Sequence, residues 1–598
     1  MYYLIILLVY AAVDAIACLG LSQQFGVAGV TNFGFILFQA AGAYVAAVLA
    51  LPADNANGGF QTYIGGFSLP FPLPWIGAAA AGGLLALPFT FLVGKRLRGD
   101  FAAVGLLVTA VLLNVLVMNF RPLFNGDAGV ALVPAPLSGG MFVSTSNSYQ
   151  YGFAAAGILL VGVVYWFLRR ITESPYGRSL RAMRNNDKVA DSLGKNLLAL
   201  RTGALVTGGA IAGLSGAILV SFIGVWSPAA WSYAETIVLF TAVIIGGAGN
   251  HVGAVLGAVL VPVGFEEATR YISNNNPNLP PNLLPSLQWV AIGLLIVVFL
   301  WVRPQGILPE RKRTIALPAG RTDEADAAPA RSARAQHARA DQPGQPDRVL
   351  IKAEGLIRDY GGVRAVAEVS MSVERGTLTG LIGPNGAGKS TLLSLLAGTE
   401  RPDAGQVIYK GSDITSMPAF RRARIGLVRT FQLASEFKGL TVLENLLSAQ
   451  PGHRGDSFAG AVSGPRRWRS DEQRAITRAG ALLSDFGLAG LANEFAGNLS
   501  GGQRRLVEIM RALMTEPDML LLDEPMAGVH PELARTIGEA LVSLCRGGMT
   551  ILMVEHELAI MDEFCDPVIV MAEGAVLASG TMRQLRDRTE VVEAYLVG

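Results

Sequence analysis

Charged residues and cysteines are both scarce in this sequence. Lysine, arginine, aspartate and glutamate make up 16% of the 598 residues, and the formal net charge is only +2. A chain so close to neutral gives no reason to expect nucleic acid as a partner, because binding to phosphate backbones requires a clustered excess of basic residues. The three cysteines, Cys18, Cys545 and Cys565, have neither metal-ligand spacing nor a disulfide framework. We expect them to be small buried apolar side chains.

Long apolar runs fill the first half of the chain. A helix needs roughly 20 apolar residues to cross the hydrocarbon of a bilayer. Runs of this kind lie at about 2–20, 30–51, 75–94, 101–118, 152–168, 202–223, 235–249, 251–267 and 286–302. The two runs between 235 and 267 are short and flank the glycine-rich break GGAGNHVGA, which is either a tight turn or a re-entrant loop. The sequence therefore predicts an all-α polytopic membrane domain over 1–304, with about nine spans.

Basic residues are concentrated in alternate loops of this domain. Lys95, Arg96 and Arg98 follow the third run and Arg169 and Arg170 follow the fifth, whereas loop 52–74 has neither lysine nor arginine. Because basic loops stay in the cytoplasm, nine spans place the N-terminus outside and the C-terminus inside. Asp14 lies within the first run, where an acid is costly unless it is hydrated, paired with a subunit or on a solute path.

The second half of the chain has a different composition. Residues 305–348 are rich in Ala, Arg, Asp and Pro without periodicity, which predicts a flexible linker. From 349 to 598, short apolar strands alternate with helices, and the candidate strands are 378–382, 518–523 and 550–554. This alternation predicts an α/β domain with a largely parallel sheet.

The strongest chemical motif is GPNGAGKST, which follows the apolar strand LTGLI and opens a helix. It matches a P-loop, in which glycines let backbone N–H groups turn toward phosphate oxygens. The residues concerned are Gly383, Pro384, Asn385, Gly386, Ala387, Gly388, Lys389, Ser390 and Thr391. Lys389 is expected to reach the β- and γ-phosphates of ATP, and the Ser390 hydroxyl is expected to hold Mg²⁺.

The second motif is MLLLDE, an apolar strand that ends in two acids. Asp523 suits the coordination shell of Mg²⁺. Glu524 suits a general base that polarises the attacking water. The pair is informative because a P-loop stands in the same domain.

A third motif narrows the class of P-loop protein. LSGGQ, Leu499 to Gln503, resembles the signature of ABC ATPases. In that family Ser500, Gly501, Gly502 and Gln503 would cap the γ-phosphate held by the opposite subunit. The resemblance also implies that Tyr360 stacks on adenine, that Gln432 senses Mg²⁺ and contacts the permease, and that His556 is the switch histidine. His530 departs from the pattern, because it stands where many ABC ATPases carry an aspartate.

Both halves resemble one ABC family, that of branched-chain (hydrophobic) amino-acid uptake. The ATPase half shows the likeness in IGLVRTFQLASEFKGLTVLENLL and EAYLVG, and the permease half in YGRSLRAMRNNDKVADSLGKN. The last segment, 176–196, is similar to the cytoplasmic coupling loop of the family's permeases. It is also a short basic amphipathic stretch between spans, which suits a position at the membrane face.

The resemblance implies an ATP-driven importer of the bacterial cytoplasmic (inner) membrane, with its ATPase domain in the cytoplasm. A periplasmic solute-binding protein would deliver a small solute, and a second permease and a second ATPase, often distinct chains, would complete the complex. Branched-chain amino acids are the expected solutes, with urea, amides or aromatic acids as the alternative. Two other classes stay open: a homodimeric exporter, disfavoured by the many short-looped spans, and a membrane-tethered ATPase switch that moves no solute.

Overall fold

The computed structural model describes residues 2–53, 61–94, 99–137, 147–275, 280, 283–312, 314–317, 348–430 and 436–597. These residues form two compact units. The helical unit comprises Met1–Arg184, Leu198–Arg311 and Ser457–Gly464, and the α/β unit comprises Asn185–Leu197, Lys312–Asp456 and Pro465–Gly598. Within the predicted linker, 318–347 lies outside the described residues, as do the basic residues Lys95, Arg96 and Arg98.

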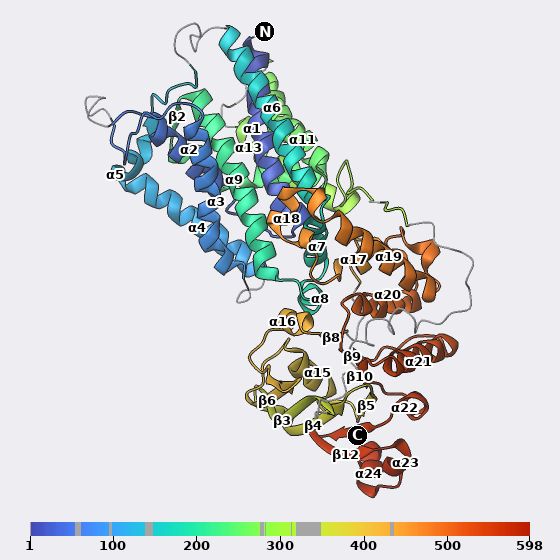
Figure 1. Cartoon of the computed structure of the whole chain (residues 1–598). Coiled ribbons are helices and arrows are strands. Elements are labelled where there is room, and N and C mark those ends of the chain that lie inside the picture. The colour runs from blue at the N-terminus through green and yellow to red at the C-terminus, as the bar shows by residue number, and fades with distance from the viewer. Residues whose placement is uncertain are drawn as a thin grey trace. The chain divides into compact units, whose positions relative to one another are not determined.

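Each predicted span overlaps at least one helix of the helical unit (Figure 1). The helices are α1 (Tyr2–Leu21), α2 (Ile36–Ala50), α3 (Leu73–Leu92), α4 (Gly99–Asn119), α6 (Asn147–Thr172), α9 (Leu197–Ile223), α10 (Tyr233–Gly246), α11 (His251–Ala258), α12 (Gly264–Asn275) and α13 (Leu283–Val302). A π-helical turn joins α11 to α12, so these two form one long segment. Among the described residues, seven helical segments are long and apolar enough to cross a membrane, and Ile36–Ala50 and Ser286–Val302 are shorter.

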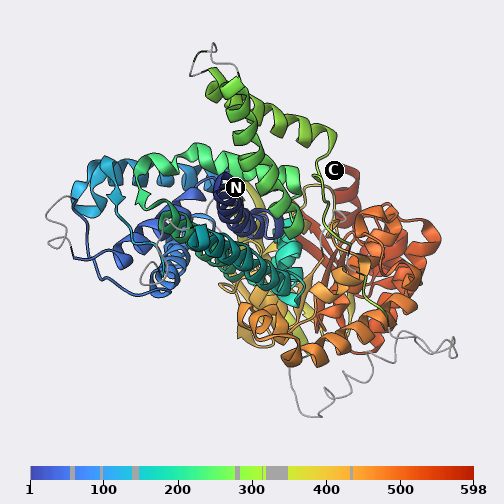
Figure 2. The same ribbon diagram turned by 90° about the horizontal axis from the view of Figure 1, so that it is seen from above.

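The glycine-rich break between α10 and α11 is a tight turn. Gly247 and Gly249 have positive φ angles, and the Asn250 side chain caps α11 by accepting from the backbone N–H of Val252, 3.0 Å away. A Cβ at Gly246 would lie 2.0 Å from the carbonyl oxygen of Gly253, so only glycine permits this approach of the two helices. In the same unit, α1 and α6 lie side by side (Figures 1 and 2).

Small residues let α9 contact several neighbouring helices at backbone distance. A Cβ at Gly213 would lie 2.3 Å from the carbonyl oxygen of Ala78 in α3, and one at Gly216 would lie 2.0 Å from that of Gln39 in α2. The Gln39 side chain donates to the Ser215 hydroxyl at 2.9 Å, within this buried contact. Close approach matters here because van der Waals packing and interhelical hydrogen bonds hold helices together in lipid.

The segment 176–196, predicted as a coupling loop, forms α7 (Pro175–Asn185) and α8 (Asp187–Ser192). Asn186 separates the two helices and caps α8 by accepting from the backbone N–H of Val189. Residues 185–197 belong to the α/β unit, where the carbonyl of Gly194 accepts from Arg424 Nε at 3.0 Å and Lys195 pairs with Asp456. Gly194 itself has a φ of +84°, which ends the helical path after α8.

The α/β unit is built on two sheets. The first is predominantly parallel with strand order β12-β11-β5-β10-β9-β8, and the second is antiparallel with order β4-β3-β6-β7. The strands are β3 (Val349–Tyr360), β4 (Val363–Glu374), β5 (Leu378–Ile382), β6 (Ala404–Tyr409), β7 (Ser412–Asp413), β8 (Leu427–Arg429), β9 (Met519–Asp523), β10 (Thr550–Val554), β11 (Val568–Ala572) and β12 (Ala575–Gly580). The three strands expected from the sequence are β5, β9 and β10, which lie at the centre of the parallel sheet.

Helices accompany both sheets of the α/β unit (Figure 1). The longer ones are α19 (Arg469–Asp485), α20 (Gly501–Met514) and α21 (Pro531–Arg546). The shorter ones are α15 (Lys389–Ala397), α16 (Ala419–Arg424), α17 (Val442–Ser448), α22 (Leu558–Phe564), α23 (Met582–Arg586) and α24 (Thr589–Val597). One buried apolar cluster joins Leu392 and Leu396 of α15 to Leu381, Leu521 and Leu552 of the parallel strands. This core holds the start of α15 at the end of β5.

Candidate active site

The predicted P-loop spans the turn from β5 into α15. Gly383, Gly386 and Gly388 all have positive φ angles, as a backbone that curls around a phosphate requires. A Cβ at Gly388 would lie 2.2 Å from the carbonyl oxygen of Ala365, so glycine is needed for packing there. At Gly386 a Cβ would meet nothing within 4 Å, so the loop is open on that side.

Lys389 begins α15, and its ammonium group folds back over the loop. Nζ donates to the carbonyl oxygens of Gly383 at 2.8 Å and Pro384 at 2.9 Å. Burial lowers the pKa of Lys389, and the nearby carboxylates of Glu524 and Asp523 partly oppose that shift. The ammonium therefore sits at the mouth of a loop whose geometry suits an anion.

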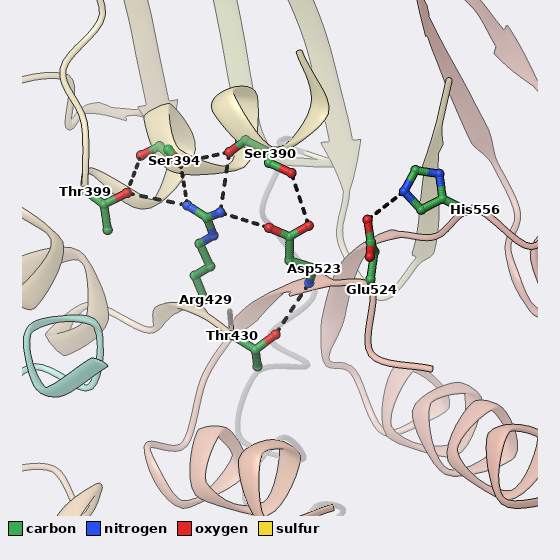
Figure 3. A network of polar contacts seen from close by, with 8 residues as sticks. All are labelled: Ser390, Ser394, Thr399, Arg429, Thr430, Asp523, Glu524 and His556. Atoms are coloured by element: carbon green, nitrogen blue, oxygen red, sulfur yellow. Dashed lines mark hydrogen bonds and ion pairs between the residues drawn. The ribbon is translucent and has the colours of Figure 1, made fainter. Parts of the chain in front are cut away.

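Ser390 and Asp523 come together, as their predicted shared task requires. Ser390 Oγ lies 3.5 Å from Asp523 Oδ1, and the Asp523 side chain is buried. The other carboxylate oxygen, Oδ2, accepts from Arg429 Nη2 at 2.9 Å (Figure 3). Hard oxygen donors of this kind are the ligands that Mg²⁺ prefers, so the pair fits a divalent cation.

Glu524 and His556 also meet, although 32 positions separate them. Glu524 Oε1 lies 2.6 Å from His556 Nε2 (Figure 3). Glu524 follows β9 with a φ of +50°, and its backbone N–H donates to the carbonyl of Val554 in β10. Its own carbonyl accepts from Arg505 Nη2 at 2.6 Å, so an arginine of α20 helps to hold this unusual backbone conformation.

The four predicted signature residues open α20 and form a capping box. Ser500 Oγ accepts from the backbone N–H of Gln503, and Gln503 Oε1 accepts from that of Ser500. Gly501 and Gly502 occupy the first turn between them, at the positive end of the helix. These residues stand outside the polar network drawn in Figure 3.

Of two further predicted residues, the structure describes Tyr360 but not Gln432. Tyr360 ends β3; its hydroxyl donates to Glu400, and the Arg358 guanidinium lies 4.8 Å above its ring. Tyr360 is also outside the network of Figure 3. Gln432 lies outside the described residues, so its predicted contact with Mg²⁺ stays a prediction.

Three polar residues that were not predicted from the sequence also support this site. Arg429 contacts Asp523, Arg505 contacts the carbonyl of Glu524, and Glu555 Oε1 accepts from the backbone N–H of Met526 at 2.7 Å. Burial raises the pKa of Glu555, against the effect of that hydrogen bond. One signal was available for Arg429, because it ends the apolar stretch IGLVR as Asp523 ends MLLLD, and charged residues that end adjacent parallel strands can meet.

Comparison with known families agrees with this geometry in both halves of the chain. Residues 3–300 match the family described as branched-chain amino acid transport system / permease component. Residues 366–527 match the ABC transporter family. These two regions cover most of the helical unit and the core of the α/β unit.

Individual relatives cover the second half. The probable branched-chain amino acid transport ATP-binding protein LivG of Archaeoglobus fulgidus is 40% identical over 41% of this chain and 95% of its own length. The high-affinity branched-chain amino acid transport ATP-binding protein BraF of Pseudomonas aeruginosa is 38% identical over 42% of this chain and 98% of its own length. A crystal structure of a nucleotide-free ATP-binding cassette from an ABC transporter is 37% identical over 41% of this chain and 98% of that chain, with a TM-score of 0.37.

Sequence identity of 38–40% over nearly the whole length of LivG and BraF shows that this chain belongs to the same family as these proteins. The permease match over residues 3–300 adds a membrane component in the same chain. The chain therefore belongs to the branched-chain amino acid family of ABC transporters, and it joins a permease component and an ABC ATPase in one polypeptide.

Proposed function

We propose that this chain imports branched-chain or related amino acids by hydrolysing ATP, as one half of a larger complex. The observation that carries the proposal is the contact of Glu524 with His556 beside the Ser390–Asp523 pair, in a chain whose first 300 residues match a permease component. The solute follows from the relatives, whose names specify branched-chain amino acid transport.

Within the ATPase, the proposed roles follow the geometry. The backbone from Gly383 to Thr391 would bind the triphosphate. The Lys389 side chain would exchange its hydrogen bonds to the two loop carbonyls for contacts with the β- and γ-phosphates. Glu524 would take the proton of the attacking water, with His556 orienting its carboxylate at 2.6 Å. Tyr360, a residue that is 41% exposed, would offer its ring to adenine.

Ser390, Asp523 and Gln432 would hold Mg²⁺ when nucleotide binds. The metal would neutralise phosphate charge as the bond to the γ-phosphate breaks. Asp523 Oδ1, which faces Ser390, would be the oxygen that contacts the metal, because Oδ2 accepts from Arg429.

The complex would contain components that this chain does not supply. Ser500, Gly501, Gly502 and Gln503 would act on nucleotide held by a second ATPase. His530, which stands where many ABC ATPases carry an aspartate, is the N-cap residue of α21. A second permease would complete the solute path, and a periplasmic binding protein would deliver the solute. The basic residues after the fifth span support a cytoplasmic position for the ATPase in a bacterial inner membrane.

Reconstitution tests this proposal. The purified chain would be placed in liposomes with a second permease, a second ATPase and a binding protein encoded by neighbouring genes, and uptake of labelled leucine measured with and without ATP on the ATPase side. We expect ATP-dependent uptake that Glu524→Gln abolishes. ATPase activity that loaded binding protein stimulates, without leucine uptake, would replace the solute by an amide, urea or an aromatic acid. Neither uptake nor stimulation would favour the non-transporting switch.

A further inference from the structure

Arg429 is a buried cation at the centre of the polar network, and the activity proposed above gives it no role. It ends β8, and its guanidinium reaches three parts of the α/β unit (Figure 3). Nη1 donates to Ser394 Oγ at 2.7 Å and Thr399 Oγ1 at 3.5 Å, while Nη2 lies 3.4 Å from the Ser390 carbonyl and 2.9 Å from Asp523 Oδ2. Arg429 thus ties the end of β8 to the P-loop helix and to the end of β9.

The partner of Arg429 is Asp523, a buried carboxylate that requires a compensating positive charge or hydrogen-bond donors. The Asp523 side chain is only 1% exposed, and a carboxylate withdrawn from water is strongly destabilising unless a cation or several donors compensate it. The ion pair with Arg429, itself 7% exposed, supplies that compensation without a metal. It also fixes the orientation of the carboxylate, since Oδ2 is held by Arg429 while Oδ1 faces Ser390.

We propose that Arg429 is a built-in counter-cation for Asp523, which stabilises the site before a divalent metal arrives and lowers the affinity of the site for that metal. The inference rests on the Mg²⁺ site proposed above and gives that site a means of release. When Mg²⁺ contacts Oδ1, a guanidinium already shares the same carboxylate, and two cations so close in a largely buried site repel each other. Arg429 therefore acts as a positioning residue that keeps metal binding reversible.

A neighbouring arginine provides a matched control. Arg422 is fully buried and donates from Nη1 to the carbonyls of Leu395 and Leu396 at 2.8 and 2.7 Å, at the other end of the P-loop helix. Replacing Arg422 should destabilise the same helix without removing the cation that pairs with Asp523. A role for Arg429 in packing alone would make Arg429→Met and Arg422→Met behave alike.

The test measures Mn²⁺ binding to the purified full chain by electron paramagnetic resonance, with a non-hydrolysable ATP analogue present, together with thermal unfolding in the absence of metal. We expect Arg429→Met to unfold at lower temperature without metal and to bind Mn²⁺ about tenfold more tightly, a change of about 1.4 kcal/mol. Arg429→Lys keeps a cation beside Asp523, so its Mn²⁺ affinity should stay closer to that of the unmodified chain than to that of Arg429→Met. Adding Asp523→Asn to Arg429→Met should remove the gain in affinity.

Three outcomes would overturn the inference. They are Mn²⁺ affinity in Arg429→Met that is unchanged or weaker, a tenfold gain in Arg422→Met as well, and a gain that persists when Asp523 is also replaced. If Arg429→Met does not fold, Arg429→Gln takes its place with the same expected results. Failure of the unmodified chain to bind Mn²⁺ with the analogue would instead remove the proposed metal site, and this inference with it.

Discussion

Glycine is needed for different reasons at Gly213 and Gly216 of α9 in the helical unit and at Gly386 of the P-loop in the α/β unit. In α9, Gly213 and Gly216 are needed because neighbouring backbones already fill the space where a side chain would go. In the P-loop, Gly386 has open space around it and is needed for its φ of +84° and for the approach of a ligand. Gly213 and Gly216 thus allow helices to approach each other closely, whereas Gly386 leaves space in which phosphate can bind. Substitutions in the two places should therefore fail differently.

The largest expected effect is the loss of ATP turnover on replacing Glu524, a change that leaves the packing of the chain intact. Glu524→Gln keeps the shape of the side chain and a possible hydrogen bond to His556, but removes the proposed base. We expect ATP turnover by the complete complex to fall by about 10²–10⁴-fold, while nucleotide binding and the thermal midpoint of the chain stay unchanged. A variant that keeps more than a tenth of the turnover would show that Glu524 is not the base.

The next largest effect tests whether glycine is required for the close packing of α9 against α2 in the helical unit. Gly216→Ala would put a Cβ 2.0 Å from the Gln39 carbonyl oxygen, so α9 and α2 must separate. We expect a loss of about 2–3 kcal/mol of stability, measured by thermal unfolding in detergent. The control is Gly162→Ala in α6, where a Cβ meets nothing within 4 Å. That change should be neutral or slightly stabilising, and equal losses in both variants would refute the packing argument.

The same substitution in the P-loop should weaken nucleotide binding as well as lower stability. Gly386→Ala meets no atom, but alanine in a left-handed conformation costs about 1–2 kcal/mol. We expect a thermal shift smaller than that of Gly216→Ala, together with about tenfold weaker binding of a fluorescent ATP analogue, equivalent to about 1.4 kcal/mol. Unchanged nucleotide affinity would contradict the assignment of this open side of the loop to phosphate.

The smallest effect compares two helix caps of the same design within the α/β unit. Ser500 caps α20 and Thr581 caps α23, each in a reciprocal capping box. Alanine at either position should lower stability by about 1 kcal/mol. Only Ser500→Ala should also reduce ATP turnover of the assembled complex, because Ser500 is proposed to act on the partner's nucleotide. Equal ATP turnover in the two variants would show that Ser500 only caps α20 and does not act on the partner's nucleotide.

Much of the fold was readable because its signals are local. Spans such as 202–223 are continuous apolar runs, and the strands β5, β9 and β10 are short apolar segments bounded by turns, so neither needs knowledge of distant residues. The P-loop likewise shows its strand, loop and helix within one stretch. The antiparallel sheet was not predicted, because the long strands β3 and β4 carry no clean alternation; β3 has a mixed burial pattern and breaks of register with β4.

The sequence by itself determined the membrane half, the P-loop at Gly383–Thr391, the acids Asp523 and Glu524 and the likeness to one transporter family, since each is written in contiguous residues. The tertiary structure alone decided which distant groups meet. Arg429 and Asp523 are 94 positions apart, and they touch because β8 and β9 pair in parallel and end at the same edge of the sheet. Gly216 and Gln39 are even further apart in sequence, and their contact depends on the crossing of two helices, which no local pattern encodes.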